Sequence, residues 1–121
     1  MSFARFSLVA LDCRDPHALA AFYQRIVGGE IKATDASPDW VELAIDSSSD
    51  LGFQLDPEHR APEWPDGLPQ QVHLDFEVAD LDEAERHAID AGAITARVQP
   101  EPDSWRVMLD PAGHPFCLVK A

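Results

Sequence analysis

Residues 73–81, HLDFEVADL, repeat the pattern of residues 8–16, LVALDCRDP, and this repetition decides the fold. At an offset of 65 residues, Leu8 falls on His73. Two later blocks also correspond, at offsets of 64 and 63 residues: 41–46 with 105–110, and 53–55 with 116–118. Self-similarity over half of a chain is the signature of a repeated structural unit. The sequence therefore predicts two copies of one strand–helix–strand–strand–strand unit.

Each copy carries the signals of a helix directly after its first strand. In the first copy, Asp15 is a typical N-cap residue and Pro16 suits the first helical position. Gly28 follows the apolar stripe of this helix and is expected to end it. In the second copy, Asp80 takes the cap position and Gly92 ends the helix. Both helices are therefore bounded by residues that favour helix ends.

Alternation and β-branched residues predict the strands of both copies. They cover 3–13, 30–34, 40–46 and 51–55 in the first copy, and 71–79, 94–98, 104–110 and 115–120 in the second. The proline-rich residues 56–70 separate the two. We expect one α+β domain over residues 1–121, built of two tandem βαβββ modules. Module 1 covers about 3–56, the linker about 57–70 and module 2 about 71–121.

Composition excludes several classes of function. A formal charge of −13 argues against nucleic acid as a partner. An acidic surface can attract cationic ligands, but on the charge alone solubility is the favoured explanation. No apolar run approaches the ~20 residues of a membrane span, and the N-terminal sequence lacks signal-peptide design. We therefore expect a cytoplasmic protein. Cys13 and Cys117 both lie in apolar strand patterns and are expected to be free thiols.

Three segments resemble one known superfamily: DPHALAAFYQRIVGGE (15–30), PEWPDGLPQQVHLDFEVADLDEAERHA (62–88) and DPAGHPFCLV (110–119). Together with the repeat, they resemble the vicinal-oxygen-chelate (VOC) superfamily of glyoxalases, bleomycin resistance proteins and extradiol dioxygenases. Within it, the chain resembles the small glyoxalase-like domains. The resemblance implies paired βαβββ modules whose curved mixed sheets enclose a cavity. It also implies a homodimer.

The resemblance further implies four positions for metal ligands, one on the first and one on the last strand of each module. Carried over by position, they are Leu8, Gln54, His73 and Cys117. Leu8 cannot bind a metal, Gln54 is a weak neutral donor, and Cys117 is a soft ligand where a carboxylate is usual. We therefore expect no metal cofactor of the usual kind.

His73 is the best single functional candidate, because the pKa of a free imidazole lies near neutrality and suits proton transfer. Asp75 shares its strand face and would orient the ring. The alternatives are a structural histidine and a solvated carboxylate. Cys117 is a candidate nucleophile or soft ligand, but no neighbour in sequence would lower its pKa. A buried, inert thiol is the favoured interpretation.

Tryptophans supply candidate walls for a ligand pocket. Trp40 and Trp64 stand beside proline or aspartate and are expected at its edge, whereas Trp105 corresponds to Val41 in the repeat and is expected in the core. We expect a glyoxalase-like protein that binds a small, mostly apolar molecule. Cationic and neutral ligands of this kind both fit the expectation. The alternative is a lyase or isomerase that uses His73, with or without a divalent metal.

Overall fold

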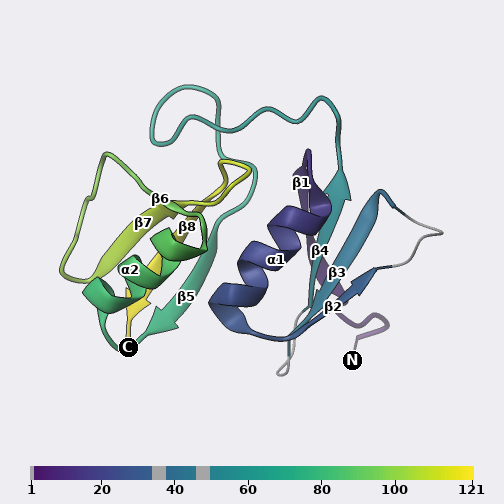
Figure 1. Cartoon of the computed structure of the whole chain (residues 1–121), viewed down its shortest axis with the longest axis horizontal. Coiled ribbons are helices and arrows are strands. Elements are labelled where there is room, and N and C mark those ends of the chain that lie inside the picture. Colours follow the sequence, from purple (N-terminus) through teal and green to yellow (C-terminus); the bar gives the residue numbers. More distant parts are fainter. Residues whose placement is uncertain (1, 34–37, 46–49) are drawn as a thin grey trace. The chain divides into compact units, whose positions relative to one another are not determined.

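The computed structural model describes residues 2–33, 38–45 and 50–121. It divides into two compact units, the first ending at His59 and the second beginning at Arg60 (Figure 1). Residues 60–70 of the expected linker therefore belong to the second unit. The sequence also predicts a turn at 47–50, between the strands expected at 40–46 and 51–55. Its first three residues lie outside the described residues, as do the last residues of the strands expected at 30–34 and 40–46.

The first unit is one mixed sheet covered by one helix. Its elements are β1 (Leu8–Cys13), α1 (Pro16–Val27), β2 (Glu30–Ala33), β3 (Trp40–Ala44) and β4 (Asp50–Leu55). The sheet order is β1-β4-β3-β2, with β1 parallel to β4 and the other pairs antiparallel. The core lies between α1 and the sheet, where Tyr23 stacks on Phe53 with ring centroids 5.9 Å apart.

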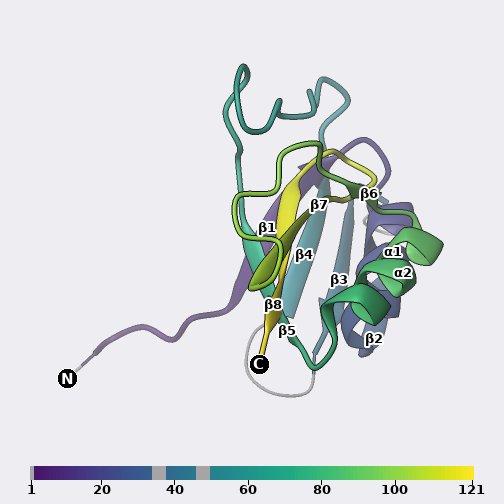
Figure 2. The ribbon, with the colours of Figure 1, turned by 90° about the vertical axis from the view of Figure 1, so that its left-hand side faces the viewer.

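The second unit repeats this plan. Its elements are β5 (Leu74–Val78), α2 (Leu81–Ala91), β6 (Ile94–Thr95), β7 (Trp105–Leu109) and β8 (Pro115–Lys120). The sheet order is β5-β8-β7-β6, again with one parallel pair, β5 with β8. In each unit the helix lies on one face of its own sheet (Figures 1 and 2). The α+β prediction of two tandem βαβββ modules is confirmed.

The predicted helix caps are also confirmed. The carboxylate of Asp15 accepts a hydrogen bond from the backbone N–H of Ala18 at 3.0 Å, and that of Asp80 accepts from Glu83 at 3.0 Å. Gly28 and Gly92 follow the last residues of α1 and α2. Neither helix is long and apolar enough to cross a bilayer in the part of the chain that is described.

Three strands are shorter than the sequence predicts by three residues or more. The strand expected at 71–79 covers only Leu74–Val78, so His73 lies just before it. The strand expected at 3–13 begins only at Leu8, and before it Phe3 and Phe6 are exposed. The strand expected at 94–98 ends at Thr95, although the N–H of Ala96 still bonds to the carbonyl of Val107 at 3.0 Å. Apolar residues alone therefore do not make a strand, because each strand also needs hydrogen-bonded neighbours.

The pairing of strands corrects the internal repeat. Leu8 lies opposite Asp50 and Leu74 lies opposite Phe116, so the first and last strands of both units share one register. A single offset of 65 residues therefore relates the two units through β4 and β8, and the offsets of 64 and 63 are wrong. A slip of two residues keeps every side chain on the same face of a strand, so the sequence pattern does not reveal it.

The corrected repeat changes which residues correspond. Trp40, not Val41, is the counterpart of Trp105: Trp40 lies opposite Gln54, as Trp105 lies opposite Val119. Both indoles are half-buried, whereas Val41 is fully buried. The counterpart of Cys117 becomes Gly52 rather than Gln54.

Candidate functional site

The second sheet has a face that α2 does not cover, here called the helix-free face. Arg106 of β7 forms ion pairs with Asp82 and Glu85 of α2, which places its side chain on the helix side. Its neighbour Val107 therefore points to the other side, because successive side chains of a strand alternate. Val107 lies opposite Cys117 in the sheet, so both belong to the helix-free face.

β5 adds two polar side chains to this face. Asp75 lies opposite Cys117 in the parallel β5–β8 pair, and His73 precedes it by two residues. Period-two alternation therefore gives His73, Asp75 and Cys117 the same orientation. The sequence already predicts that His73 and Asp75 share a face. The proximity of Cys117 depends on the pairing of strands far apart in sequence.

These three side chains converge on one atom. Nε2 of His73 lies 2.9 Å from Oδ1 of Asp75 and 3.2 Å from Sγ of Cys117. The imidazole is 42% exposed and the carboxylate 64%, whereas Cys117 is only 6% exposed. We call this group the His–Asp–Cys cluster. It offers a nitrogen, an oxygen and a sulfur atom, all within 4.8 Å of one another.

The Cys117 thiol is protonated at neutral pH. Burial raises its pKa from 9.0 to about 11, and the nearby carboxylate of Asp75 adds to the rise. The expectation of a buried thiol is confirmed, and its pKa agrees with an inert thiol. The sequence does not predict the contact between Cys117 and His73, because the two residues are 44 positions apart.

Apolar side chains surround the cluster on the same unit. Cys117 belongs to a buried group with Ala96 and Val107, against which four partly buried residues pack: Trp64, Trp105, Leu109 and Val119. Trp64 comes from the expected linker, and its indole covers this group. The helix-free face is therefore apolar with one polar corner.

The first unit has no comparable set of donors at the equivalent positions. Leu8 and Gly52 stand where the second unit has His73 and Cys117, and a Cβ on Gly52 would overlap the Trp40 indole. It would also come within 3.2 Å of Cδ1 of Leu8. The Trp40 ring therefore fills this place. Gln54 lies opposite Asp12, four residues beyond Leu8 along β1, so the structure does not bring Leu8 and Gln54 together.

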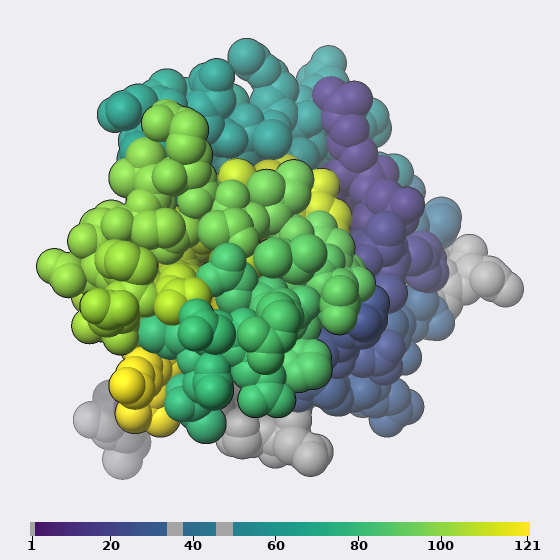
Figure 3. Space-filling model, turned by 60° about the vertical axis from the view of Figure 1, so that its left-hand side comes forward, coloured from purple at the N-terminus to yellow at the C-terminus, as the bar shows by residue number. Residues whose placement is uncertain are grey.

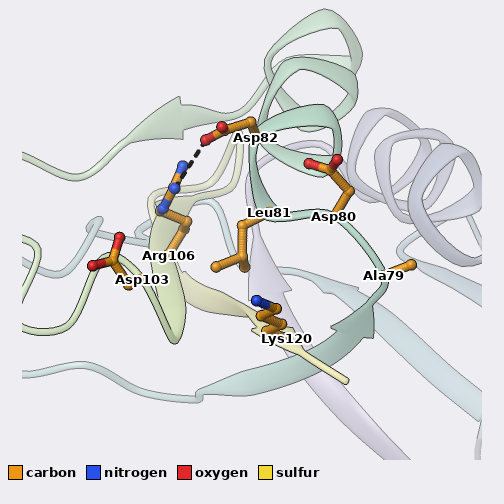
Figure 4. Close-up of a pocket in the computed structure, with 7 residues that line it drawn as sticks. All are labelled: Ala79, Asp80, Leu81, Asp82, Asp103, Arg106 and Lys120. Carbon is orange, nitrogen blue, oxygen red and sulfur yellow. Dashed lines mark ion pairs between the residues drawn. The ribbon is translucent and has the colours of Figure 1, made fainter.

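A separate hollow of about 380 Å³ opens on the helix side of the second unit, at the start of α2 (Figure 4). The residues of α2 lie at the surface of the molecule in Figure 3. It is lined by Ala79, Asp80, Leu81, Asp82, Asp103, Arg106 and Lys120. The hydrogen bonds that the Arg106 guanidinium donates to the carboxylates of Glu85 and Asp82 raise its pKa. None of the seven lining residues is a histidine or cysteine. The hollow therefore shares no residue with the His–Asp–Cys cluster.

The residues of the His–Asp–Cys cluster also fit a divalent metal of the zinc type. Three protein ligands drawn from histidine, carboxylate and thiolate make a typical open zinc site, with a fourth position left for water or substrate. Asp75 is not among the four positions that the resemblance implies, yet its carboxylate completes this group of three donors. The alternation of His73 and Asp75 on one strand is the sequence signal for it.

Comparisons with known proteins agree with this architecture. A family model described as glyoxalase-like domain matches residues 8–119. A glyoxalase/bleomycin resistance protein/dioxygenase family enzyme from Burkholderia phytofirmans is similar, with 25% identity, a TM-score of 0.73, and coverage of 97% of this chain and 98% of that one. Among curated proteins, no sequence matches the chain significantly.

Two structures of the fosfomycin resistance protein FosX from Listeria monocytogenes are similar in fold. One has 16% identity and a TM-score of 0.72, over 99% of this chain and 95% of that one. The other, an E126Q mutant complexed with Mn(II) and dihydroxypropylphosphonic acid, has 16% identity and a TM-score of 0.69, over 98% and 90%. At this identity the likeness concerns the fold.

Proposed function

The chain belongs to the glyoxalase-like domain family, and we propose that it binds a small, mostly apolar molecule on the helix-free face of its second unit. The observation that supports this is the His–Asp–Cys cluster beside the indoles of Trp64 and Trp105. Apolar walls with a few convergent polar groups are the usual composition of a ligand site. His73 and Asp75 form the polar end.

The charge of this end favours a ligand with a cationic or hydrogen-bond-donating group. Asp75 is a largely exposed carboxylate, and Glu77 follows it on the same face of β5. The formal charge of −13 adds a long-range attraction for cations, which salt weakens. Aromatic rings at the apolar side would also attract a cation through their faces.

A second candidate function is acid–base catalysis by His73, in a lyase or isomerase reaction. The specific observation in its favour is the 2.9 Å contact between His73 Nε2 and Asp75 Oδ1. A carboxylate in this position holds the proton on Nε2, which leaves Nδ1 as the basic nitrogen. Cys117 is protonated at neutral pH and therefore does not act as the nucleophile in this reaction.

We also propose a homodimer in the cytoplasm. Each sheet has edge strands, β1 and β2 in the first unit and β5 and β6 in the second, and edges of this kind are often covered by a partner chain. Both cysteines are buried and neither forms a disulfide, in keeping with a reducing compartment. Light scattering at micromolar concentration tests the dimer, and a single-chain mass would contradict it.

A ligand screen in the presence of EDTA tests the proposed function. Thermal shift and tryptophan fluorescence report binding, and each hit is measured again with His73→Ala and Asp75→Asn. The matched control is His87→Ala, which removes an exposed histidine that faces Glu83 on α2. We expect the two site variants to weaken binding and the control to leave it unchanged. Hits that bind equally to all the variants would refute the proposed site.

A further inference from the structure

We propose that Trp64 limits the size of the ligand that the helix-free face admits, and that a closed loop of residues 60–71 holds its indole in place. This segment, here called the Trp64 loop, lies between β4 and β5 and is drawn in teal in Figure 1. Slender molecules reach the Cys117 side of the cluster, and ring-sized ones do not. What Trp64 selects rests on the ligand site proposed above, but its effect on access to Cys117 can be measured without a ligand.

Hydrogen bonds close the Trp64 loop at its base and at its tip. At the base, Nε2 of Gln71 donates to the backbone carbonyl of Arg60 at 3.0 Å. At the tip, the backbone N–H of Glu63 donates to the carbonyl of Leu68 at 2.7 Å. The N–H of Leu68 donates in turn to Oε1 of Glu63 at 2.8 Å. Trp64 is the first residue inside the tip, so these bonds fix where its side chain begins.

Gly67 allows the tip to close this tightly. Its φ of +106° lies in the region that favours glycine. A Cβ at this position would lie 2.8 Å from Oε1 of Glu63, the oxygen that accepts the hydrogen bond from Leu68. Any other residue would strain the turn and displace this acceptor. The local sequence therefore specifies the closed tip.

The Trp64 loop also packs against the sheet of the second unit. Pro62 is buried, and a Cβ on Gly113 would overlap the side chain of Ala61. Gly113 lies in the turn that precedes β8, the strand that carries Cys117. The loop and the sulfur are therefore held by the same part of the sheet.

The indole covers the sulfur side of the cluster. Cys117 is 6% exposed, whereas the imidazole of His73 and the carboxylate of Asp75 are 42% and 64% exposed. Of the four partly buried residues that pack on the Cys117 group, Trp64 alone belongs to a loop, and the other three stand on β7 or β8. A large, rigid indole on a pinned loop sets the width of the space above the sulfur.

Thiol reagents of two sizes measure this access. Cys117 is the only cysteine of a Cys13→Ala chain, and it is treated with methyl methanethiosulfonate or with its benzyl analogue. In both reactions the thiolate displaces methanesulfinate and forms a mixed disulfide. The raised pKa of Cys117 slows both reagents alike, so the ratio of the methyl to the benzyl rate reports steric access. Relative to the urea-unfolded chain, this ratio should be raised about tenfold or more, because two hydrogen bonds hold the tip closed.

Variants of the loop assign the effect. Trp64→Ala and the larger replacement Trp64→Leu should both lower the ratio toward that of the unfolded chain. Glu63→Ala removes the side-chain acceptor of Leu68 and should lower the ratio by about fivefold. Glu63→Gln keeps an acceptor oxygen and should retain the ratio of the parent. The matched control is Glu58→Ala, an exposed glutamate outside the loop, and circular dichroism checks that each variant is folded.

The ligand screen tests the selection itself. Ring-sized compounds should bind Trp64→Ala more tightly than the parent, whereas slender hits should not gain. If the parent shows the reagent ratio of the unfolded chain, or if folded Trp64→Ala and Glu63→Ala keep the ratio of the parent, the inference fails. An unchanged ratio refutes the role of Trp64, whereas hits that ignore His73→Ala refute the ligand site, so the two failures are distinguishable.

Discussion

The reactivity of Cys117 gives a direct test of the environment described for the cluster. Burial and Asp75 raise the pKa of this thiol from 9.0 to about 11. At neutral pH this leaves about 100-fold less thiolate than in an unperturbed cysteine. A more basic thiolate is more nucleophilic, with a Brønsted slope of about 0.4–0.5, which recovers roughly six- to tenfold. We therefore expect alkylation about 10- to 15-fold slower than that of a free thiol, and burial of the sulfur slows it further.

The pH dependence of this reaction has a definite sign. The thiolate fraction rises with pH, so the alkylation rate should climb about tenfold per pH unit and level off only near pH 11. The same shift lowers stability at alkaline pH. Between pH 9 and 11 the unfolded thiol has lost its proton and the folded one has kept it, so unfolding becomes more favourable as pH rises.

The perturbation is Asp75→Asn, measured with iodoacetamide on EDTA-treated protein in a Cys13→Ala background. Burial is the larger cause of the shift, so removing the carboxylate should accelerate alkylation by less than about tenfold. Glu77→Gln, on the same face of β5, is the matched control and should have no effect. A rate that levels off near pH 8 or 9 in the parent protein would refute the account of this environment.

Three further predictions concern stability, each measured by urea unfolding. Gly52→Val should cost about 1–3 kcal/mol, because its side chain would overlap the Trp40 ring; an unchanged midpoint would mean that the ring lies elsewhere. Trp64→Ala should lower the free energy of unfolding by about 1–3 kcal/mol, less than for a fully buried aromatic residue, because its indole is only partly buried on the second unit. A loss below about 0.5 kcal/mol, typical of a surface residue, would show that the indole does not pack there. Asp80→Ala should lower the free energy of unfolding by about 1 kcal/mol, because α2 loses its N-cap. An unchanged unfolding midpoint would show that this cap does not stabilise the protein.

The sequence predicts the parts of this fold that have local causes. Both helices begin at the expected caps, Asp15 and Asp80, because a cap depends on hydrogen bonds between residues three apart. Strand alternation likewise places His73 and Asp75 on one face. These features need no knowledge of distant residues.

The sequence does not predict the features that depend on strand register. A slip of two residues preserves the inward and outward pattern of a strand, so the sequence pattern aligns Gln54 with Cys117. The strand pairing shows instead that Gly52 is the counterpart of Cys117. A slip of one residue aligned Val41 with Trp105. Val41 faces the helix of the first unit, whereas Trp105 lies on the helix-free face of the second. The contact of Cys117 with His73 has the same non-local origin, and it adds the third member of the cluster.

The position of a bound ligand relative to the three tryptophans tests the central claim most directly. Two-dimensional NMR resolves the indole N–H signals of Trp40, Trp64 and Trp105, which Trp→Phe variants assign. With a hit from the screen, the account predicts the largest shifts at Trp64 and Trp105, together with the backbone amides of His73 and Cys117. Shifts confined to Trp40, or to the amides of Asp80 and Lys120 at the hollow beside α2, would contradict it.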